Sequence, residues 1–151
     1  MARCRTKYLG DVVYGDEAVI EFPAGLPGFE PEKTFILLTA PDLEPLVFMQ
    51  SLATPELCFT TIPVLSVMAD YSLSMSASDL DSLKLPLGRQ PVIGRDVACL
   101  AILHFAEQAT TANLRAPIVI DLKARRGVQA IAPEERYSHR HELHLEEVRS
   151  C

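Results

Sequence analysis

The chain has 151 residues, of which 48% are hydrophobic and 23% charged, and its formal net charge is −6. A chain of this length forms one domain and buries roughly 68–70% of the surface that the unfolded chain exposes. No run approaches the ~18 consecutive apolar residues of a membrane span, and no apolar segment follows the basic start, so we expect a cytoplasmic protein without an export signal.

Ten short β-rich segments follow one another along the chain, separated by turn residues. They are TKYLG (6–10), DVVYG (11–15), AVIEF (18–22), TFILLTA (34–40), LVFMQSL (46–52), LCFTTIPV (57–64), YSLSM (71–75), VACLAILHFA (97–106), APIVIDLK (116–123) and VQAIAP (128–133). No long helical pattern lies between them. This spacing is typical of an antiparallel barrel or sandwich rather than a βαβ fold. We therefore predict an all-β fold, an antiparallel barrel or sandwich with one or two short helices, over residues 1–137.

The clearest helix lies in SASDLDSLKL (76–85), where Ser76 or Ser78 is placed to cap the first turn and Leu80 and Leu83 share one face. Residues 85–95 are predicted to form a connecting loop. Residues 138–151 are polar and of mixed charge, and we interpret them as a C-terminal tail that forms a short helix or stays partly disordered.

Residues 22–35, FPAGLPGFEPEKTF, combine two glycines with three prolines and three phenylalanines. Glycine supplies positive φ and proline fixes φ, so this loop should be stiff and cost little entropy to order. One interpretation is a structural loop whose aromatic rings close one end of a core. The other is a rigid surface for recognition. We expect core packing for Phe22, Leu26 and Phe35.

Residues 110–131, TTANLRAPIVIDLKARRGVQAI, contain Asn113, the only asparagine of the chain. The alternation in 118–123 and the return in 128–131 predict a β-hairpin whose turn is Arg125-Arg126-Gly127. The loop that precedes the hairpin would display Asn113 and Arg115 to a partner.

Signatures of catalysis are missing from the sequence. It contains no G-x-S-x-G, G-x-x-x-x-G-K-[ST] or G-x-G-x-x-G motif. His141 and His144 are one residue too close for H-E-x-x-H, so we interpret HRHELH (139–144) as a solvated segment rather than a zinc site. His104 lies in an apolar run, which favours a histidine of the core or of the barrel edge. The four cysteines are dispersed, and we expect Cys58 and Cys99 to be buried thiols. We predict no enzyme, no metal and no cofactor.

The charge is distributed unevenly along the chain. Residues 8–83 contain one basic residue, Lys33, and twelve acidic ones, a net charge of −11, whereas residues 76–151 contain ten of each sign. Such a surface repels nucleic-acid phosphates and attracts a basic protein.

Several of these blocks together resemble the flagellar assembly factor FliW family. They are FPAGLPGFE, MQSL, DYSLSM, TANLRAPIVI, RRGVQAI and YSHRH, which occur in the family's order from about Lys7 to His141. The resemblance implies a cytosolic, non-catalytic protein whose fold is a small antiparallel β-barrel-like domain with one or two short helices. It further implies binding of flagellin, the filament subunit, and of CsrA, the RNA-binding repressor of flagellin translation. Free FliW would antagonise CsrA at a surface away from its RNA contacts.

Our hypothesis for partner contact names Phe29, Glu30, Asp70 and Tyr71, together with Asn113 and Arg115. Two other functions stay open at this point: an RNA-binding β-barrel, which the charge opposes, and a metal-dependent enzyme that uses the C-terminal histidines.

Overall fold

A computed structural model describes residues 1–132 and 136–143. The strands are β1 (Ala2–Arg5), β2 (Asp11–Tyr14), β3 (Ile20–Glu21), β4 (Thr34–Leu38), β5 (Val47–Ser51), β6 (Cys58–Pro63), β7 (Val97–Phe105), β8 (Thr110–Ala112), β9 (Ile118–Asp121), β10 (Arg126–Gln129) and β11 (His141–Glu142). The α-helices are α1 (Val64–Val67) and α2 (Ala77–Ser82), and short 3₁₀ helices span η1 (Asp16–Ala18) and η2 (Pro41–Leu43).

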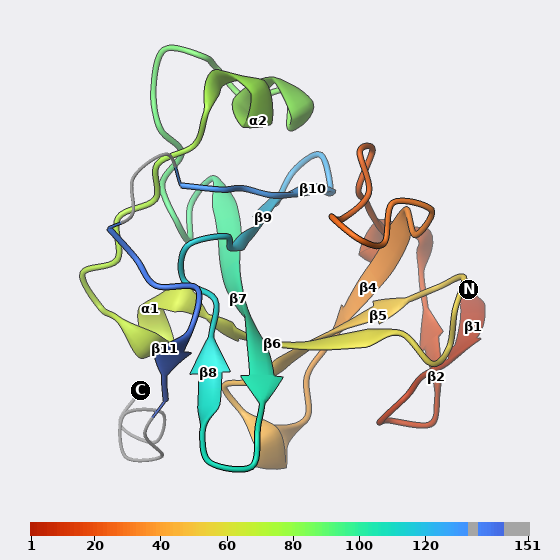
Figure 1. Cartoon of the computed structure of the whole chain (residues 1–151). Helices are drawn as coiled ribbons and strands as arrows, with labels where there is room; N and C mark the ends of the chain where they lie inside the picture. The colour runs from red at the N-terminus through yellow and green to blue at the C-terminus, as the bar shows by residue number, and fades with distance from the viewer. Residues whose placement is uncertain (133–135, 144–151) are drawn as a thin grey trace.

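Seven strands close into a barrel, one of the two architectures that the strand pattern allows and the one that the family resemblance implies. They pair in the order β7-β6-β5-β4-β3-β10-β9, and β9 pairs again with β7 to complete the ring (Figure 1). The pairings are antiparallel except that of β3 with β10, which is parallel and joins Glu21 to Arg126. Closure leaves no exposed edge within the ring, which protects the barrel from pairing with other chains.

Two further groups of strands lie outside the ring. The β8 and β11 strands extend the sheet outward from β7. The β1–β2 hairpin forms its own two-stranded sheet and is attached to β5: the Lys7 amide donates to Gln50 Oε1 over 2.9 Å, and the Tyr8 ring lies 5.5 Å from the Phe48 ring.

The barrel wall separates two apolar cores, because successive side chains of a strand point to opposite faces. Leu100 of β7 belongs to the inner core, whereas its neighbours Cys99 and Ala101 belong to the outer one. The inner core brings together residues from opposite sides of the ring; it consists of Ile20, Phe22, Leu26, Phe35, Met49, Leu100, Ile118 and Ile120. The outer core lies beneath α1, α2 and the segment 71–75.

The α2 helix begins as the sequence predicts. The Ser76 hydroxyl accepts a hydrogen bond from the Asp79 amide over 3.1 Å, and Leu80 and Leu83 are buried in the outer core. An N-cap of this kind satisfies one of the amides that the first turn leaves without an intrahelical partner.

Three local predictions are wrong. The segment 71–75 is not a strand: buried Tyr71 alternates with an exposed Ser72, as in a strand, but this segment packs on the barrel without a β partner. Residues 6–10 form the turn between β1 and β2, where the Thr6 hydroxyl donates to the Gly10 carbonyl over 2.6 Å. The turn of the β9–β10 hairpin is 122–125, and Arg126 and Gly127 belong to β10.

The region predicted as a tail contributes a strand. The β11 strand pairs with β8 through His141 opposite Ala112 and Glu142 opposite Thr111. The sheet therefore continues past residue 138, while His144 and the rest of the predicted tail lie outside the described residues. None of the helices in the described part of the chain is long and apolar enough to cross a membrane.

Candidate functional site

The loop from residue 22 to 33, between β3 and β4, closes one end of the barrel and is held by its own backbone. The Gly25 amide donates to the Phe22 carbonyl over 2.8 Å, and the Phe29 amide donates to the Leu26 carbonyl over 2.7 Å. Both Gly25 and Gly28 have positive φ, of 70° and 85°. Phe22 and Leu26 are buried in the inner core, as predicted.

Acidic side chains of this 22–33 loop tie it together. A Glu30 carboxylate oxygen accepts a hydrogen bond from the Gly28 amide over 2.6 Å, in an exposed position. The Glu32 carboxylate accepts from the hydroxyls of Ser51, over 2.8 Å, and of Thr54. Charge-assisted bonds of this kind fix the conformation of the loop before any partner binds.

Phe29 is the aromatic residue that the loop leaves on the surface. Its side chain is 40% exposed, and its ring meets the Phe59 ring edge to face at 5.3 Å. Phe59 lies in turn 6.2 Å from Phe35, and Phe35 5.3 Å from Phe22. The loop therefore agrees with both interpretations of its sequence. Some of its aromatic rings fill the barrel, as in a structural loop, and one ring is exposed to solvent, as in a surface for recognition.

The pair Asp70–Tyr71 is divided between surface and core. Asp70 is exposed, but Tyr71 is buried, and its hydroxyl donates to the Leu114 carbonyl over 2.6 Å. The Tyr71 ring also stacks on Tyr137 at 4.3 Å, and burial raises the pKa of its hydroxyl. Tyr71 thus positions the chain on either side of it and does not present its ring to a partner.

The loop that contains Asn113 and Arg115 lies beside Tyr71. Asn113 Oδ1 accepts from the Ala116 amide over 3.0 Å, the local backbone bond expected of asparagine in a turn. The Arg115 carbonyl accepts from the Ala132 amide over 3.0 Å, and the side chains of both residues are half-buried. The structure therefore brings Tyr71, Asn113 and Arg115 together through Leu114.

Asn113 also lines a hollow of about 490 Å³ beside the β7–β8 hairpin. Its other polar lining residues are His104, Gln108, Thr111, His139 and Arg140, and no carboxylate is among them. His104 is exposed here, at the edge of the barrel rather than in the core. We refer to this feature as the β7–β8 hollow.

Sequence reasoning did not find the β7–β8 hollow. The available signal was the alternation along two paired strands: His104 lies opposite Thr111 and Ile102 lies near Asn113, so all four face one side. The contribution of residues 139–140 depends on β11, which lies within the segment 138–151 that we interpreted as a tail.

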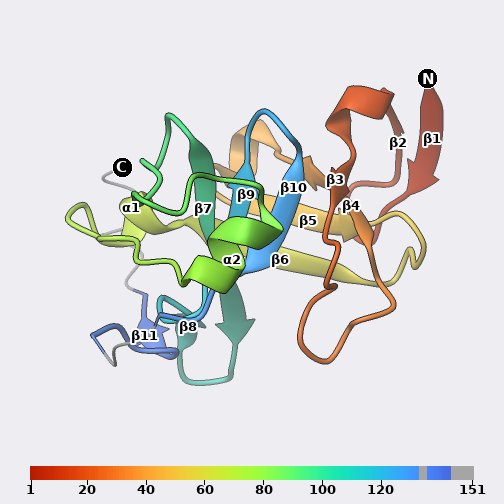
Figure 2. The same ribbon diagram turned by 90° about the horizontal axis from the view of Figure 1, so that it is seen from above.

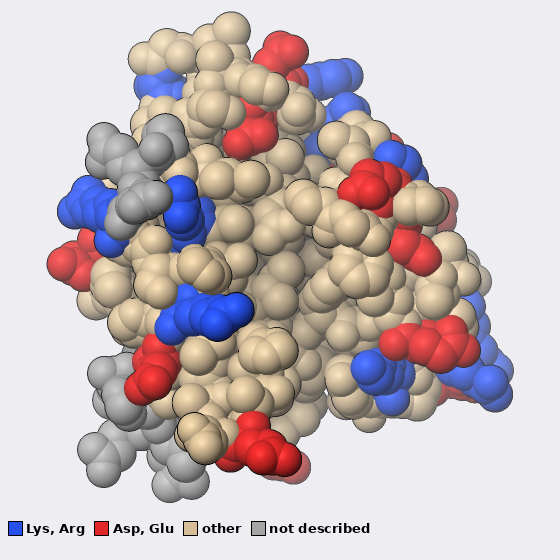
Figure 3. All heavy atoms as spheres, in the orientation of Figure 1, with Lys and Arg blue, Asp and Glu red and all other residues tan. Residues whose placement is uncertain are grey.

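The 22–33 loop and the β8–β11 strands project to the same side of the barrel. Figures 1 and 2 agree on this arrangement, and Figure 3 shows the face that carries both. This face is hollowed along its middle, uncharged side chains line the hollow, and charged side chains lie around it (Figure 3). A partner that covers the face would reach Phe29 and Asn113 together, whereas Asp70 follows α1 on its flank.

The acidic residues of the first half lie mostly on the surface. Ten of the twelve between positions 8 and 83 are exposed; they are Asp11, Asp16, Glu17, Glu21, Glu30, Asp42, Glu44, Glu56, Asp70 and Asp81. Within residues 1–132 and 136–143, the one ion pair closer than 4 Å joins Arg95 to Asp96, at 3.4 Å. No cationic side chain among the described residues forms an ion pair with these exposed carboxylates, and they give this part of the chain a negative field.

In the described part of the chain, no three histidine, cysteine, aspartate or glutamate side chains lie close enough together to bind a metal ion. His144 of the HRHELH segment lies outside that part. Of the cysteines, Cys99 is buried as predicted and Cys58 is only half-buried.

Comparison with known proteins gives one consistent result. The model of the FliW protein family matches residues 3–143. The flagellar assembly factor FliW of Geobacillus kaustophilus is 38% identical over 145 residues, which cover 95% of this chain and 96% of that protein. The flagellar assembly factor FliW of Clostridium botulinum is 30% identical over 143 residues, covering 95% and 97%. A crystal structure of a flagellar assembly factor FliW has a TM-score of 0.83 and 36% identity, and covers 96% of this chain and 99% of its own.

Proposed function

The chain belongs to the FliW family of flagellar assembly factors, and we propose that it acts by binding two proteins in alternation, flagellin before export and the translational repressor CsrA. In this scheme flagellin that has not been exported occupies the protein. Once flagellin leaves the cell, the freed protein binds CsrA and relieves repression of flagellin translation. The protein makes and breaks no covalent bond, and it works in the cytoplasm, where both partners are found.

The observation that carries this proposal is the combination of an exposed acidic half with a preformed loop. CsrA is an RNA-binding protein and therefore carries basic side chains, and exposed carboxylates attract such a protein at long range during encounter. Glu30 lies within the loop and Asp70 on the flank of the face in Figure 3, and both are exposed.

The 22–33 loop supports high affinity because it is already ordered. Association costs free energy whenever loops and side chains lose freedom, and a loop held by internal hydrogen bonds loses little. Phe29 offers a half-exposed aromatic ring whose inner edge is fixed against Phe59. Aromatic residues are enriched at the buried centre of interfaces, where a few side chains carry most of the binding energy.

Alternation between the partners needs coupled or overlapping sites. The face in Figure 3 combines the 22–33 loop with the β7–β8 hollow, which is lined by His104, His139 and Arg140 without a carboxylate. We propose that the two partners compete for this face, with Asn113 and Arg115 contributing at the hollow side. Binding of one partner then lowers the affinity for the other by the same factor in either order.

Charge reversal tests the acidic surface. In the variant Glu30→Arg/Asp70→Arg, CsrA affinity measured by isothermal titration calorimetry should fall about tenfold or more, because attraction becomes repulsion at two positions. The matched control is Glu17→Arg, which makes the same change in η1, on the opposite side of the barrel (Figure 2). It should stay within about twofold of the parent, as expected of a charge outside the interface. Equal affinities in all three folded proteins would refute the surface assignment.

The aromatic anchor is tested separately with Phe29→Ala. Phe29 packs on the surface side of Phe59, so the variant should fold, and its affinity for at least one of the two partners should fall about tenfold. Val13→Ala is a control, since it truncates a similarly exposed apolar side chain on the β1–β2 hairpin. Unchanged affinity of the Phe29 variant for both flagellin and CsrA would exclude the loop from either interface.

A further inference from the structure

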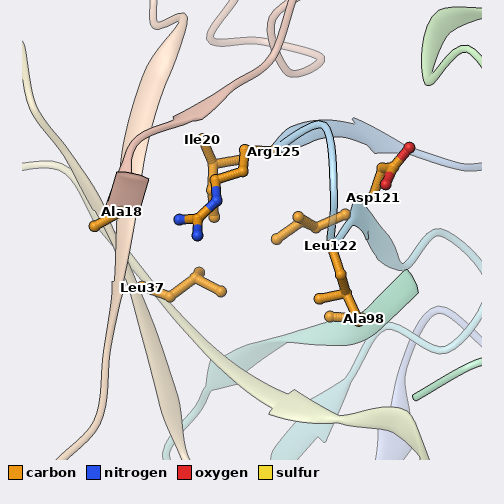
Figure 4. A pocket seen from close by; sticks show the side chains of 8 residues that line it. Ala18, Ile20, Leu37, Ala98, Asp121, Leu122 and Arg125 are labelled. Carbon is orange, nitrogen blue, oxygen red and sulfur yellow. The ribbon is translucent and has the colours of Figure 1, made fainter. Parts of the chain in front are cut away.

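A second cavity is lined by residues of the 122–125 turn and of η1, which project on the side of the barrel opposite to the 22–33 loop (Figure 2). Its volume is about 300 Å³, and it is lined by Ala18, Ile20, Leu37, Ala98, Ile120, Asp121, Leu122 and Arg125 (Figure 4). We refer to it as the Arg125 cavity. A volume of ~300 Å³ is at the lower end of the range for small-molecule sites, so it suits a ligand of a few heavy atoms.

The floor of the Arg125 cavity is the inner core of the barrel. Ile20 and Ile120 belong to that core, and Leu37 and Ala98 pack against it while remaining partly exposed. These residues come from β3, β9, β4 and β7, which the ring of strands holds in fixed positions. The cavity is therefore preformed, and its interior favours an aliphatic group over water.

One cation is directed into this apolar space. The Arg125 guanidinium points into the cavity, next to Ala18 and Leu37 (Figure 4). Within the described part of the chain, no hydrogen bond or ion pair engages this guanidinium, although arginine has five donors to satisfy.

The neighbouring carboxylate does not neutralise it. Asp121 Oδ1 accepts from the amides of Lys123, over 2.9 Å, and Ala124, over 3.2 Å, and so stabilises the turn. Its carboxylate points away from the cavity (Figure 4). The cavity thus combines an aliphatic wall with an uncompensated positive charge.

The backbone of Arg125 is held in a strained conformation. Its φ is +56°, in the left-handed region that glycine adopts with least strain. The Arg125 amide donates to the Asp121 carbonyl over 2.9 Å, and its carbonyl accepts from the Glu21 amide of β3 over 3.0 Å. Glycine would satisfy the same turn with less strain, so the turn itself does not require an arginine side chain at this position.

We propose that the Arg125 cavity binds a small aliphatic carboxylate, whose chain packs on Ile20, Leu37 and Ala98 and whose carboxylate pairs with the Arg125 guanidinium. Guanidinium and carboxylate form two parallel hydrogen bonds, and the surrounding apolar wall strengthens them by excluding water. Inorganic phosphate is a poorer match, because it has no apolar part and needs more donors than one side chain offers. The site is separate from the proposed partner surface, on the other side of the barrel.

The test is a titration of the full-length ¹⁵N-labelled protein, followed by amide chemical shifts, with three probes: hexanoate, hexanol and inorganic phosphate. Hexanoate should shift the amides of residues 18–20, 37, 98 and 120–125 in a saturable way. Hexanol lacks the charge and phosphate lacks the chain, so each should bind about tenfold or more weakly. Shifts that do not saturate with hexanoate, or equal binding of hexanol or phosphate, would overturn the proposal.

Two variants and one control locate the site. Arg125→Gly removes the guanidinium and relieves the positive φ, so it should keep or raise the unfolding temperature while hexanoate affinity falls about tenfold or more. Ala98→Leu fills the cavity and should abolish binding even if the glycine variant folds poorly. Lys123→Ala removes an equal charge from the same turn outside the cavity and should bind hexanoate like the parent. Undiminished binding by Arg125→Gly, or an equal loss in Lys123→Ala, would refute the site.

Discussion

Two glycines of the 22–33 loop offer a matched test of how the loop is built. Gly25 and Gly28 both have φ in the left-handed region, at +70° and +85°, so alanine at either position carries backbone strain. They differ in their surroundings. A Cβ on Gly28 would meet no atom within 4 Å, whereas a Cβ on Gly25 would overlap the Glu30 carbonyl oxygen and lie 2.7 Å from Glu30 Cα.

The magnitudes follow from this difference. Gly28→Ala should lower the free energy of unfolding by about 1 kcal/mol, the cost of placing a side chain at positive φ. Gly25→Ala adds an overlap with backbone atoms that a rotamer change cannot relieve, which costs a further ~2 kcal/mol. For a chain of this size these losses correspond to roughly 2–4 °C for Gly28→Ala and about three times that for Gly25→Ala.

The assay is urea unfolding followed by circular dichroism, with thermal unfolding as a second measure. The informative quantity is the difference in free energy of unfolding between the two variants, because the backbone strain that both variants share cancels in it. If both variants lose the same stability, or if Gly25→Ala is harmless, then Gly25 is not packed against Glu30, and the loop does not hold Phe29 in the way described.

Three further outcomes follow from single contacts. Tyr71→Phe leaves the buried Leu114 carbonyl without its donor and should cost about 1–2 kcal/mol in urea unfolding; a neutral result would mean that the hydroxyl does not support the 113–115 loop. Ser76→Ala removes the N-cap of α2 and should cost about 1 kcal/mol, which Ser76→Asp should restore, and failure of this rescue would contradict the cap. Burial raises the pKa of the Cys99 thiol from 9.0 to about 12, so the folded protein retains a proton that the unfolded chain releases. The contribution of Cys99 to the free energy of unfolding is fully present below pH 9 and is lost as the pH rises toward 12. The loss should be about 1 kcal/mol at pH 10. In Cys99→Ala, the free energy of unfolding should therefore fall less between pH 8 and pH 10 than in the parent.

The parts of the fold that follow from local pattern were predictable from the sequence. The turn-separated β segments predicted an antiparallel barrel or sandwich, and Ser76 before an acidic first turn predicted α2. The glycines and prolines of the 22–33 loop predicted a stiff closure that buries Phe22 and Leu26 and leaves Phe29 for the surface, and the structure has this arrangement.

The rest depends on contacts between residues that are distant along the chain. Tyr71 alternates with polar neighbours as in a strand, but its hydroxyl partner, Leu114, lies 43 positions away, and no local pattern reveals that it is buried. The parallel pairing of β3 with β10 closes the ring over a long separation, through Glu21 and Arg126. The left-handed conformation of Arg125 follows from that pairing and from the turn, so the cavity that it occupies was not visible in the sequence.

Competition between the two proposed partners tests the central claim most directly. A complex of the protein with fluorescently labelled CsrA is titrated with export-competent flagellin, and the anisotropy of the label is followed. The account predicts that flagellin releases CsrA in a saturable way, and that the Phe29→Ala and Glu30→Arg/Asp70→Arg variants alter this exchange while Glu17→Arg does not. Stable binding of both partners at once with unchanged affinities, or failure of the protein to bind either, would contradict it.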